Sequence, residues 1–204
     1  MSSIEQGLAA FEAEKYNEAF EIFMPLAEAG NLEAQEIIAG MYLTGKGIES
    51  DFNQAIKWYR LPAESGHPIA QNNLGVLLSA SGNREEAIKW LMVSAQKNIP
   101  FAQSALGDIF SKNNKTSAEA ITWYKAAAVQ NFPWACYRLG EIYAKGQGVP
   151  KNDAEAVKWY RKAAQDYRPS QEILGNAYKE GLLGLPQDEE LARYWLVERA
   201  NLVL

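Results

Sequence analysis

The residues that could carry chemistry in this sequence are few. The 204-residue chain has one His and one Cys, His67 and Cys136. A metal site built on two imidazoles is therefore excluded, and a single thiol cannot form an internal disulfide. His67 could serve a Ser-His-Asp triad only if a carboxylate oriented it and a Ser faced it, so we expect a capping or solvated role. Cys136 has no His nearby in sequence and is predicted to be a packing residue.

Other patterns resemble catalytic motifs only in part. Residues 40–47 read GMYLTGKG, close to the phosphate loop G-x-x-x-x-G-K-[ST], but Gly47 stands where a Mg-binding hydroxyl is needed. The acidic pairs at 85–86 and 189–190 fall at expected helix starts, where carboxylates complement the helix dipole. No pair of carboxylates is placed in a closed pocket. The sequence therefore predicts no catalytic residue, no cofactor and no metal ion.

Composition narrows the choice of partner. The chain has 20 basic and 25 acidic residues, a formal charge of -5. Nucleic acid is not an expected partner, because phosphate binding needs basic surface. No apolar run approaches the roughly 20 residues that span a bilayer, and the N-terminus lacks signal-peptide features. We expect a cytoplasmic protein that does not insert into membranes.

A repeat positions every residue of interest. Five Trp residues recur at 58, 90, 123, 159 and 195, each in a phrase like Ala-Val-Lys-Trp-Tyr. A second phrase precedes each Trp, with small, large, small and large residues at offsets 0, 4, 5 and 8, which is one face of a helix. Each repeat is thus predicted to be helix–turn–helix. Helix starts are expected at Pro68, Pro100, Pro133 and Pro169, and helix ends at Gly30, Gly66, Asn98 and Asn131.

Stacking explains why such a unit repeats. One helical hairpin cannot bury its apolar stripe alone, whereas stacked hairpins share a continuous core. We expect the five Trp to be wedges in that core, and the small residue at offset 5 to let neighbouring helices approach closely. The chain is predicted to be a single repeat domain, 1–204. It divides into a capping hairpin, 1–31, and repeats at 32–67, 68–99, 100–131, 132–167 and 168–204.

The two phrases resemble the Sel-one-like repeat (SLR) family of the tetratricopeptide-like superfamily. The repeat that begins at Ala135 matches the family pattern nearly throughout, including Gly146, Gly148, Asp153 and Trp159. This resemblance implies an all-α fold, a right-handed α–α superhelical solenoid of helix–turn–helix repeats plus an N-terminal capping hairpin. It also implies that first helices line the concave face and that the role is to bind proteins.

The candidate binding groove is the stripe of first-helix residues that points away from the core, at offsets 2, 3, 6 and 9. The same offsets include Ile37, Gly40, Ser104 and Ser111. Trp134 is the one Trp outside the repeat register, and two roles are open to it: packing at the core or rim, or contact with a ligand. The predicted groove residues are Glu36, Asn72, Asn73, Val76, Asp108, Trp134, Tyr137, Arg138, Glu141, Asn176 and Lys179.

Three functions follow from this reading. The favoured one is a non-enzymatic interaction scaffold or adaptor that holds a protein or peptide in its concave groove. The alternative is a bacterial immunity protein that neutralises a secreted effector toxin, and a hydrolase is the least favoured. The apolar end, 202–204, either folds back on a helix expected at 188–200 or mediates weak self-association.

Overall fold

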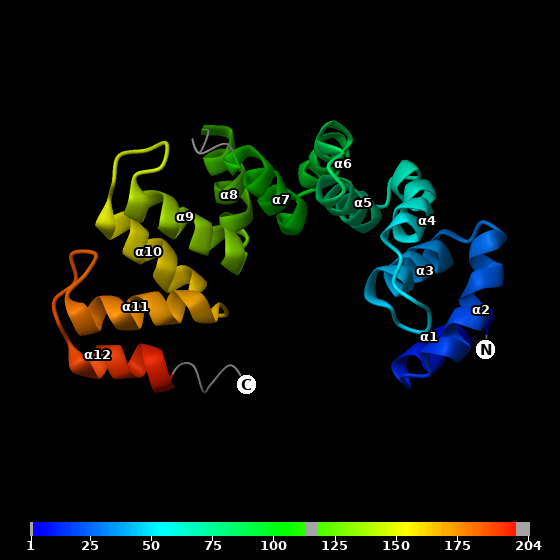
Figure 1. Ribbon diagram of the computed structural model, residues 1–204, viewed down its shortest axis with the longest axis horizontal. Coiled ribbons are helices and arrows are strands. Elements are labelled where there is room, and N and C mark those ends of the chain that lie inside the picture. The colour runs from blue at the N-terminus through cyan, green and yellow to red at the C-terminus, as the bar shows by residue number, and fades with distance from the viewer. Residues whose placement is uncertain (1, 113–117, 199–204) are drawn as a thin grey trace. The chain divides into compact units, whose positions relative to one another are not determined.

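The computed structural model of this chain describes residues 2–112 and 118–198, which are helical and contain no strand (Figure 1). The apolar end at 202–204 lies outside the described residues. The α-helices are α1 (Ser3–Glu12), α2 (Tyr16–Glu28), α3 (Leu32–Thr44), α4 (Phe52–Glu64), α5 (Pro68–Ala80), α6 (Arg84–Gln96), α7 (Pro100–Ser111), α8 (Ala118–Val129), α9 (Pro133–Lys145), α10 (Asp153–Ala163), α11 (Arg168–Glu180) and α12 (Glu189–Arg193), which continues into a short π-helix, Tyr194–Glu198.

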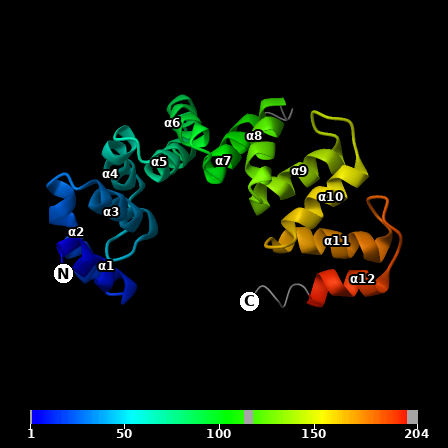
Figure 2. The same ribbon diagram turned by 180° about the vertical axis from the view of Figure 1, so that it is seen from behind.

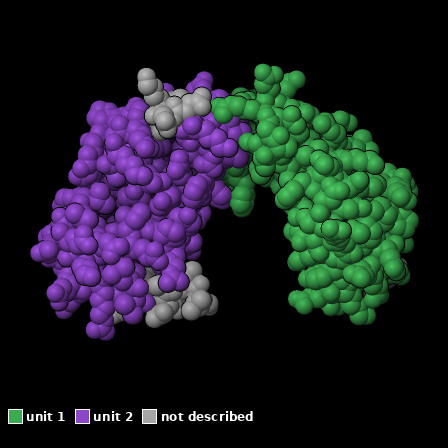
Figure 3. Space-filling model, in the orientation of Figure 1, with its two compact units in different colours: residues 1–102 green, residues 103–204 purple. Residues whose placement is uncertain are grey.

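The chain forms two compact units, which we call unit 1 (residues 1–102) and unit 2 (residues 103–204) (Figure 3). Unit 1 contains the hairpins α1–α2, α3–α4 and α5–α6. Unit 2 contains all of α8 and the hairpins α9–α10 and α11–α12, together with most of α7. Within each unit, helices that follow one another in sequence pack together (Figure 2). The predicted fold class, an all-helical solenoid of stacked hairpins, is confirmed.

Helix ends lie where the sequence predicts them. Pro68 and Pro133 occupy the first turns of α5 and α9, where a missing N–H is not needed. The chain leaves four helices in the left-handed region, with φ of 91° at Gly30, 94° at Gly66, and 63° and 61° at Asn98 and Asn131. The segment 40–47 is the end of α3 and its turn, so it is not a phosphate loop.

The repeated Trp residues contact the neighbouring core but are not its deepest members. Trp58 packs against the core of α1–α3, and Trp159 against that of α8 and α9, so both join consecutive hairpins as predicted. Each indole is only partly buried. The fully buried side chain is the next residue, Tyr124 or Leu91 for example. The wedge interpretation is therefore right about position and overstates the depth of the ring.

Small residues of the first helices make room for these deep side chains. A Cβ added at Gly107 would lie 2.6 Å from the Tyr124 ring, and one at Gly140 would lie 2.6 Å from the Tyr160 ring. Gly75 stands in the same relation to Leu91. This confirms that the small residue at offset 5 permits close approach between the two helices of one hairpin.

A further repeated contact was not anticipated from the sequence. The buried side-chain amides of Gln35 and Gln71 donate to the carbonyl oxygens of Ala27 and Ala63, both at 2.9 Å, near the end of the preceding second helix. In unit 2, the side-chain amide of Gln171 donates to the carbonyl oxygen of Ala164 at 2.8 Å.

Cys136 occupies the same position in α9 that these Gln residues occupy in their helices, with its Sγ 4.0 Å from the Ala128 oxygen. Its burial, which raises the pKa of the thiol, confirms the predicted packing role.

Candidate functional site: the exposed face of the first helices

Every predicted groove residue lies at a position that is at least partly exposed. Because the two units are separate compact bodies, they carry two candidate surfaces. Glu36, Asn72, Asn73 and Val76 belong to unit 1, and the other predicted residues belong to unit 2. Ser104, at offset 2 of its helix, is an exception among the wider stripe. Only 2% of it is exposed, so the helical wheel misplaces it.

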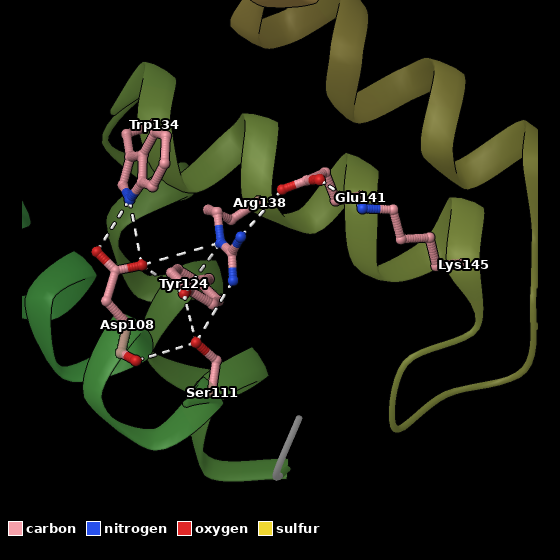
Figure 4. Close-up of polar contacts among 7 residues, drawn as sticks. All are labelled: Asp108, Ser111, Tyr124, Trp134, Arg138, Glu141 and Lys145. Carbon is pink, nitrogen blue, oxygen red and sulfur yellow. Dashed lines mark hydrogen bonds and ion pairs between the residues drawn. The ribbon is translucent and has the colours of Figure 1, made fainter. Parts of the chain in front are cut away.

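In unit 2, three helices meet at a connected polar network, which we call the Arg138 cluster (Figure 4). The Trp134 indole Nε1 of α9 donates to Oδ2 and Oδ1 of Asp108 on α7, at 3.0 and 3.2 Å. The Tyr124 hydroxyl of α8 donates to Asp108 Oδ1 at 2.6 Å and accepts from Arg138 Nε at 3.3 Å. The cluster comprises Asp108, Ser111, Tyr124, Trp134, Arg138, Glu141 and Lys145.

Arg138 has partners on both sides. Its Nη1 donates to Glu141 Oε2 at 3.0 Å, and its Nη2 donates to Ser111 Oγ at 3.4 Å. Glu141 also accepts from Lys145 Nζ at 2.7 Å. The side chain of Arg138 is 25% exposed and that of Glu141 is 16% exposed. The guanidinium is thus held in one orientation while part of it still faces solvent.

Aromatic rings surround this network. The Trp134 ring stacks on Tyr137, with centroids 5.5 Å apart and an interplanar angle of 28°, and meets Tyr167 edge-on at 6.0 Å. The Arg138 guanidinium carbon lies 5.7 Å from the Trp134 centroid, within cation–π range. Of the two roles left open for Trp134, the structure shows packing at the rim of the core. Contact with a ligand stays a prediction.

The tyrosines of this surface are held in their neutral form. Burial raises the pKa of Tyr124 to about 12, and its hydrogen bond to Asp108 contributes to the rise. Burial, followed by the charge of Glu141, raises the pKa of Tyr137, Tyr160 and Tyr167. These phenols therefore donate hydrogen bonds near neutral pH and are poor nucleophiles.

The surface of unit 1 has a polar network of its own. His67 Nδ1 lies 2.7 Å from Glu36 Oε1, which brings the start of α5 against α3. Asn73 Nδ2 donates to the Tyr59 hydroxyl at 3.2 Å, and Asn72 donates to Asn73 at 3.0 Å. His67 does stand at the N-cap of α5, but its side chain makes no capping bond. The predicted capping role of the ring is therefore not observed, whereas the predicted solvated role holds in part, because the side chain is 45% exposed while it pairs with Glu36.

Two predicted residues stand apart from both networks. Asn176 and Lys179 lie exposed on α11, and within residues 2–112 and 118–198 their side chains make no polar contact. Sequence reasoning in turn missed Tyr59 and Tyr124. Each directly follows a repeat Trp, and its ring is buried while its hydroxyl reaches the first-helix face. The Gly opposite each of them, Gly40 and Gly107, is the signal that could have indicated this.

Neither a metal centre nor a membrane span is found in the described part of the chain. No group of three His, Cys, Asp or Glu residues there is placed to hold a metal ion. No described helix combines the length and apolarity that crossing a bilayer requires. Likewise, no Ser hydroxyl among the described residues is hydrogen-bonded to His67, so a triad is not assembled there.

Comparison with known proteins places this geometry among Sel1 repeats, the repeat of the Sel-one-like family. The Sel1 repeat family model matches residues 32–67, 68–98, 135–166 and 169–198. A protective antigen of uropathogenic Escherichia coli that displays an SLR fold is 30% identical, with a TM-score of 0.82. The alignment covers 98% of this chain and 45% of that one, so this chain spans less than half of that protein.

Two further crystal structures are similar. A Sel1 repeat protein from Oxalobacter formigenes is 32% identical with a TM-score of 0.74, over 97% of this chain and 84% of that one. An immunity protein from Pseudomonas aeruginosa has a TM-score of 0.65 over 97% of this chain and 82% of its own. At 18% identity that likeness concerns the fold alone. No curated protein matches the chain.

Proposed function

Because this chain belongs to the Sel1 repeat family, a generally non-catalytic scaffold for protein–protein interaction, we propose that it binds a protein or peptide partner on its first-helix face. This face is the concave groove that the family resemblance implies. The observation that carries the proposal is the Arg138 cluster, in which a Trp and an Arg are both fixed and partly exposed.

Residue type and rigidity both support binding at this cluster. Trp, Tyr and Arg dominate the binding energy of protein interfaces, especially where they sit in packed surroundings. Ordering a free side chain on association costs roughly 0.5–1.5 kcal/mol. Arg138 and Trp134 are already ordered by Tyr124, Asp108 and Tyr137, so that cost is reduced here.

The raised tyrosine pKa values make these phenols unsuited to act as general bases or nucleophiles near neutral pH. A general base or nucleophile needs a pKa matched to working pH, and burial moves these phenols the other way. Arg138 also keeps its charge, since burial lowers its pKa but the bond to Tyr124 and the nearby carboxylates outweigh that effect. The proposed role of the cluster is therefore to recognise a protein or peptide partner. A cytoplasmic location of the chain is a separate prediction.

Capture of partners from a native lysate, followed by mass spectrometry, tests this proposal. The test variant is Arg138→Ala with Glu141→Ala, which removes an ion pair from the first-helix face without changing net charge. The matched control is Lys158→Ala with Glu155→Ala, which removes an exposed pair of 3.1 Å from the second helix α10. We expect a partner that the wild type and the control retain and the test variant loses. Equal capture by both variants would exclude the Arg138 cluster as the binding site.

Immunity against a secreted effector toxin is the second candidate. The observations that favour it are the fold shared with the Pseudomonas aeruginosa immunity protein and the formal charge of -5, which suits a basic toxin. The test is co-expression with a toxin encoded beside this chain, in a host that the toxin kills. Survival that requires the Arg138 cluster would support immunity. Death of the host despite soluble expression of this chain would count against it.

A further inference from the structure

A cavity of about 310 Å³ lies in unit 1, between α1 and α3. Leu8 and Phe11 of α1 line one side, and Ile37 and Met41 of α3 line the other. Gly40 forms part of the same wall, at an offset that predicts the exposed groove. The cavity is therefore a hollow in the first-helix face of unit 1, and its surroundings are mainly apolar.

Of the two polar side chains at this cavity, Thr44 already has a hydrogen-bond partner, whereas Lys46 can still pair with a ligand carboxylate. The hydroxyl of Thr44 is already used, because it donates to the Gly40 carbonyl oxygen at 2.8 Å. Lys46 is held at the edge by two rings, with its Nζ 4.9 Å from the Tyr16 centroid and 5.5 Å from the Phe11 centroid. Among residues 2–112 and 118–198, no carboxylate lies within ion-pair distance of Lys46. An apolar hollow thus has a positioned ammonium group at its rim.

We propose that this cavity takes one large apolar side chain of a partner peptide, with an adjacent Asp or Glu of that peptide pairing with Lys46. The inference rests on the proposed binding function and adds to it the chemistry of the segment bound in unit 1. It concerns α1 and α3, whereas the Arg138 cluster lies on α7, α8 and α9, so the two sites can be altered separately.

Volume and apolarity indicate the first element of that segment. A cavity of about 150 Å³ is enough to hold a benzene ring, so about 310 Å³ accommodates a Phe or Leu side chain. Pockets for whole small molecules start near this size and extend to about 1,000 Å³. Removing one large apolar side chain from water strengthens binding roughly tenfold or more.

Charge indicates the second element. The formal charge of -5 disfavours a long acidic tract, but fields from distant charges fade beyond about 8–10 Å at ordinary ionic strength. A single carboxylate next to Lys46 therefore gains from the local ammonium without meeting the rest of the surface. At a solvent-exposed rim, that pairing strengthens binding roughly threefold.

Three labelled ten-residue Gly/Ser peptides test the inference by fluorescence anisotropy. Their central dipeptides are Phe-Asp, Phe-Lys and Ser-Asp. We expect the affinity for the Phe-Asp peptide to be roughly threefold higher than for the Phe-Lys peptide. It should be at least roughly tenfold higher than for the Ser-Asp peptide. Lys46→Glu should reverse the preference between Phe-Asp and Phe-Lys.

Gly40→Leu fills the cavity without an obvious cost to folding. A Cβ at Gly40 meets only the Tyr59 hydroxyl, at the ordinary contact distance of 3.6 Å. This variant should unfold at or above the wild-type midpoint and should bind the Phe-Asp peptide roughly tenfold more weakly. The Lys158→Ala, Glu155→Ala variant is the control, because it removes an exposed ion pair from α10 and should leave this peptide affinity unchanged.

Several results would overturn the inference. One is an affinity for the Phe-Asp peptide that is equal to or weaker than the affinity for Ser-Asp. Another is a folded Gly40→Leu protein that binds the Phe-Asp peptide as tightly as wild type does. Retained partner capture alongside any of these results would leave the proposed function standing.

Discussion

The indole N–H of Trp134 is shared between the two carboxylate oxygens of Asp108, at 3.0 and 3.2 Å, and so ties α9 to α7 across 26 residues of sequence. This bond sets the edge of the indole toward Asp108. Its face is then left for Tyr137 and Arg138. The orientation of the most exposed aromatic group in the cluster therefore depends on a carboxylate from a different repeat.

Trp134→Phe should reveal the energy of this link. The variant keeps an aromatic ring against Tyr137 but removes the donor, so Asp108 loses one of its partners. We expect the free energy of unfolding to fall by about 1 kcal/mol, the usual value for a partly exposed hydrogen bond. Urea unfolding of Trp134→Phe, Asp108→Ala and the double variant measures the coupling. A coupling energy of zero would show that the bond does not contribute to stability.

Gly140→Ala and Gly40→Ala should have opposite effects on stability. A Cβ at Gly140 would lie 2.6 Å from the Tyr160 ring, so overpacking should cost about 1–3 kcal/mol. A Cβ at Gly40 has room, and Ala is favoured over Gly inside a helix by about 0.5–1 kcal/mol. Chemical denaturation of both variants compares them directly. A destabilised Gly40→Ala protein would contradict the open space that the structure shows.

Gln71→Ala tests the repeated bond between consecutive hairpins. The variant leaves the Ala63 carbonyl without the amide that reaches it at 2.9 Å in a buried site. We expect a loss of about 0.5–1.5 kcal/mol in the free energy of unfolding, because the Ala63 oxygen keeps the bond from the Gly66 N–H at 3.0 Å. Gln96→Ala is the matched control, because Gln96 is the same residue type on an exposed helical position. Equal effects of the two substitutions would mean that the buried bond adds nothing.

Alkaline pH should lower stability through Tyr124. Its pKa of about 12 in the folded protein lies above the value of 10.0 for an unperturbed Tyr. The folded state therefore keeps a proton that the unfolded state releases, and stability falls as pH rises from about 10 toward 12. In the wild type, Tyr124 should lower the free energy of unfolding by up to about 1.4 kcal/mol for each pH unit in this range. Tyr124→Phe has no phenol to titrate, so it should not show this loss. Unfolding free energies of both proteins between pH 8 and 11 test this, and parallel curves would contradict it.

Local sequence patterns predict much of this fold. Period and residue size place the helices, and Pro68, Gly66 and Asn98 mark where they begin or end, because each of these residues has a restricted or permissive backbone. The resemblance to Sel-one-like repeats rests on the same positions. These features depend on neighbours a few residues away, which a single sequence displays.

Contacts between repeats were harder to anticipate. The Asp108–Trp134 bond joins residues on helices that are not consecutive, and the Glu36–His67 pair joins α3 to the start of α5. The helical wheel also placed Ser104 outward, although packing buries it. Each of these depends on how neighbouring hairpins are offset, and residue spacing within one repeat does not determine that offset.

Tyr124 belongs to the core through its ring, which packs on Gly107, and to the Arg138 cluster through its hydroxyl. Mutation at this residue would therefore alter folding and the proposed binding surface together. Trp134 and Arg138 stand at the rim, where a change would act mainly on the binding that we propose for this cluster. A change of partner at this surface would therefore occur through substitutions of Trp134 and Arg138. Tyr124 would stay unchanged, because it supports both the core and the rim residues.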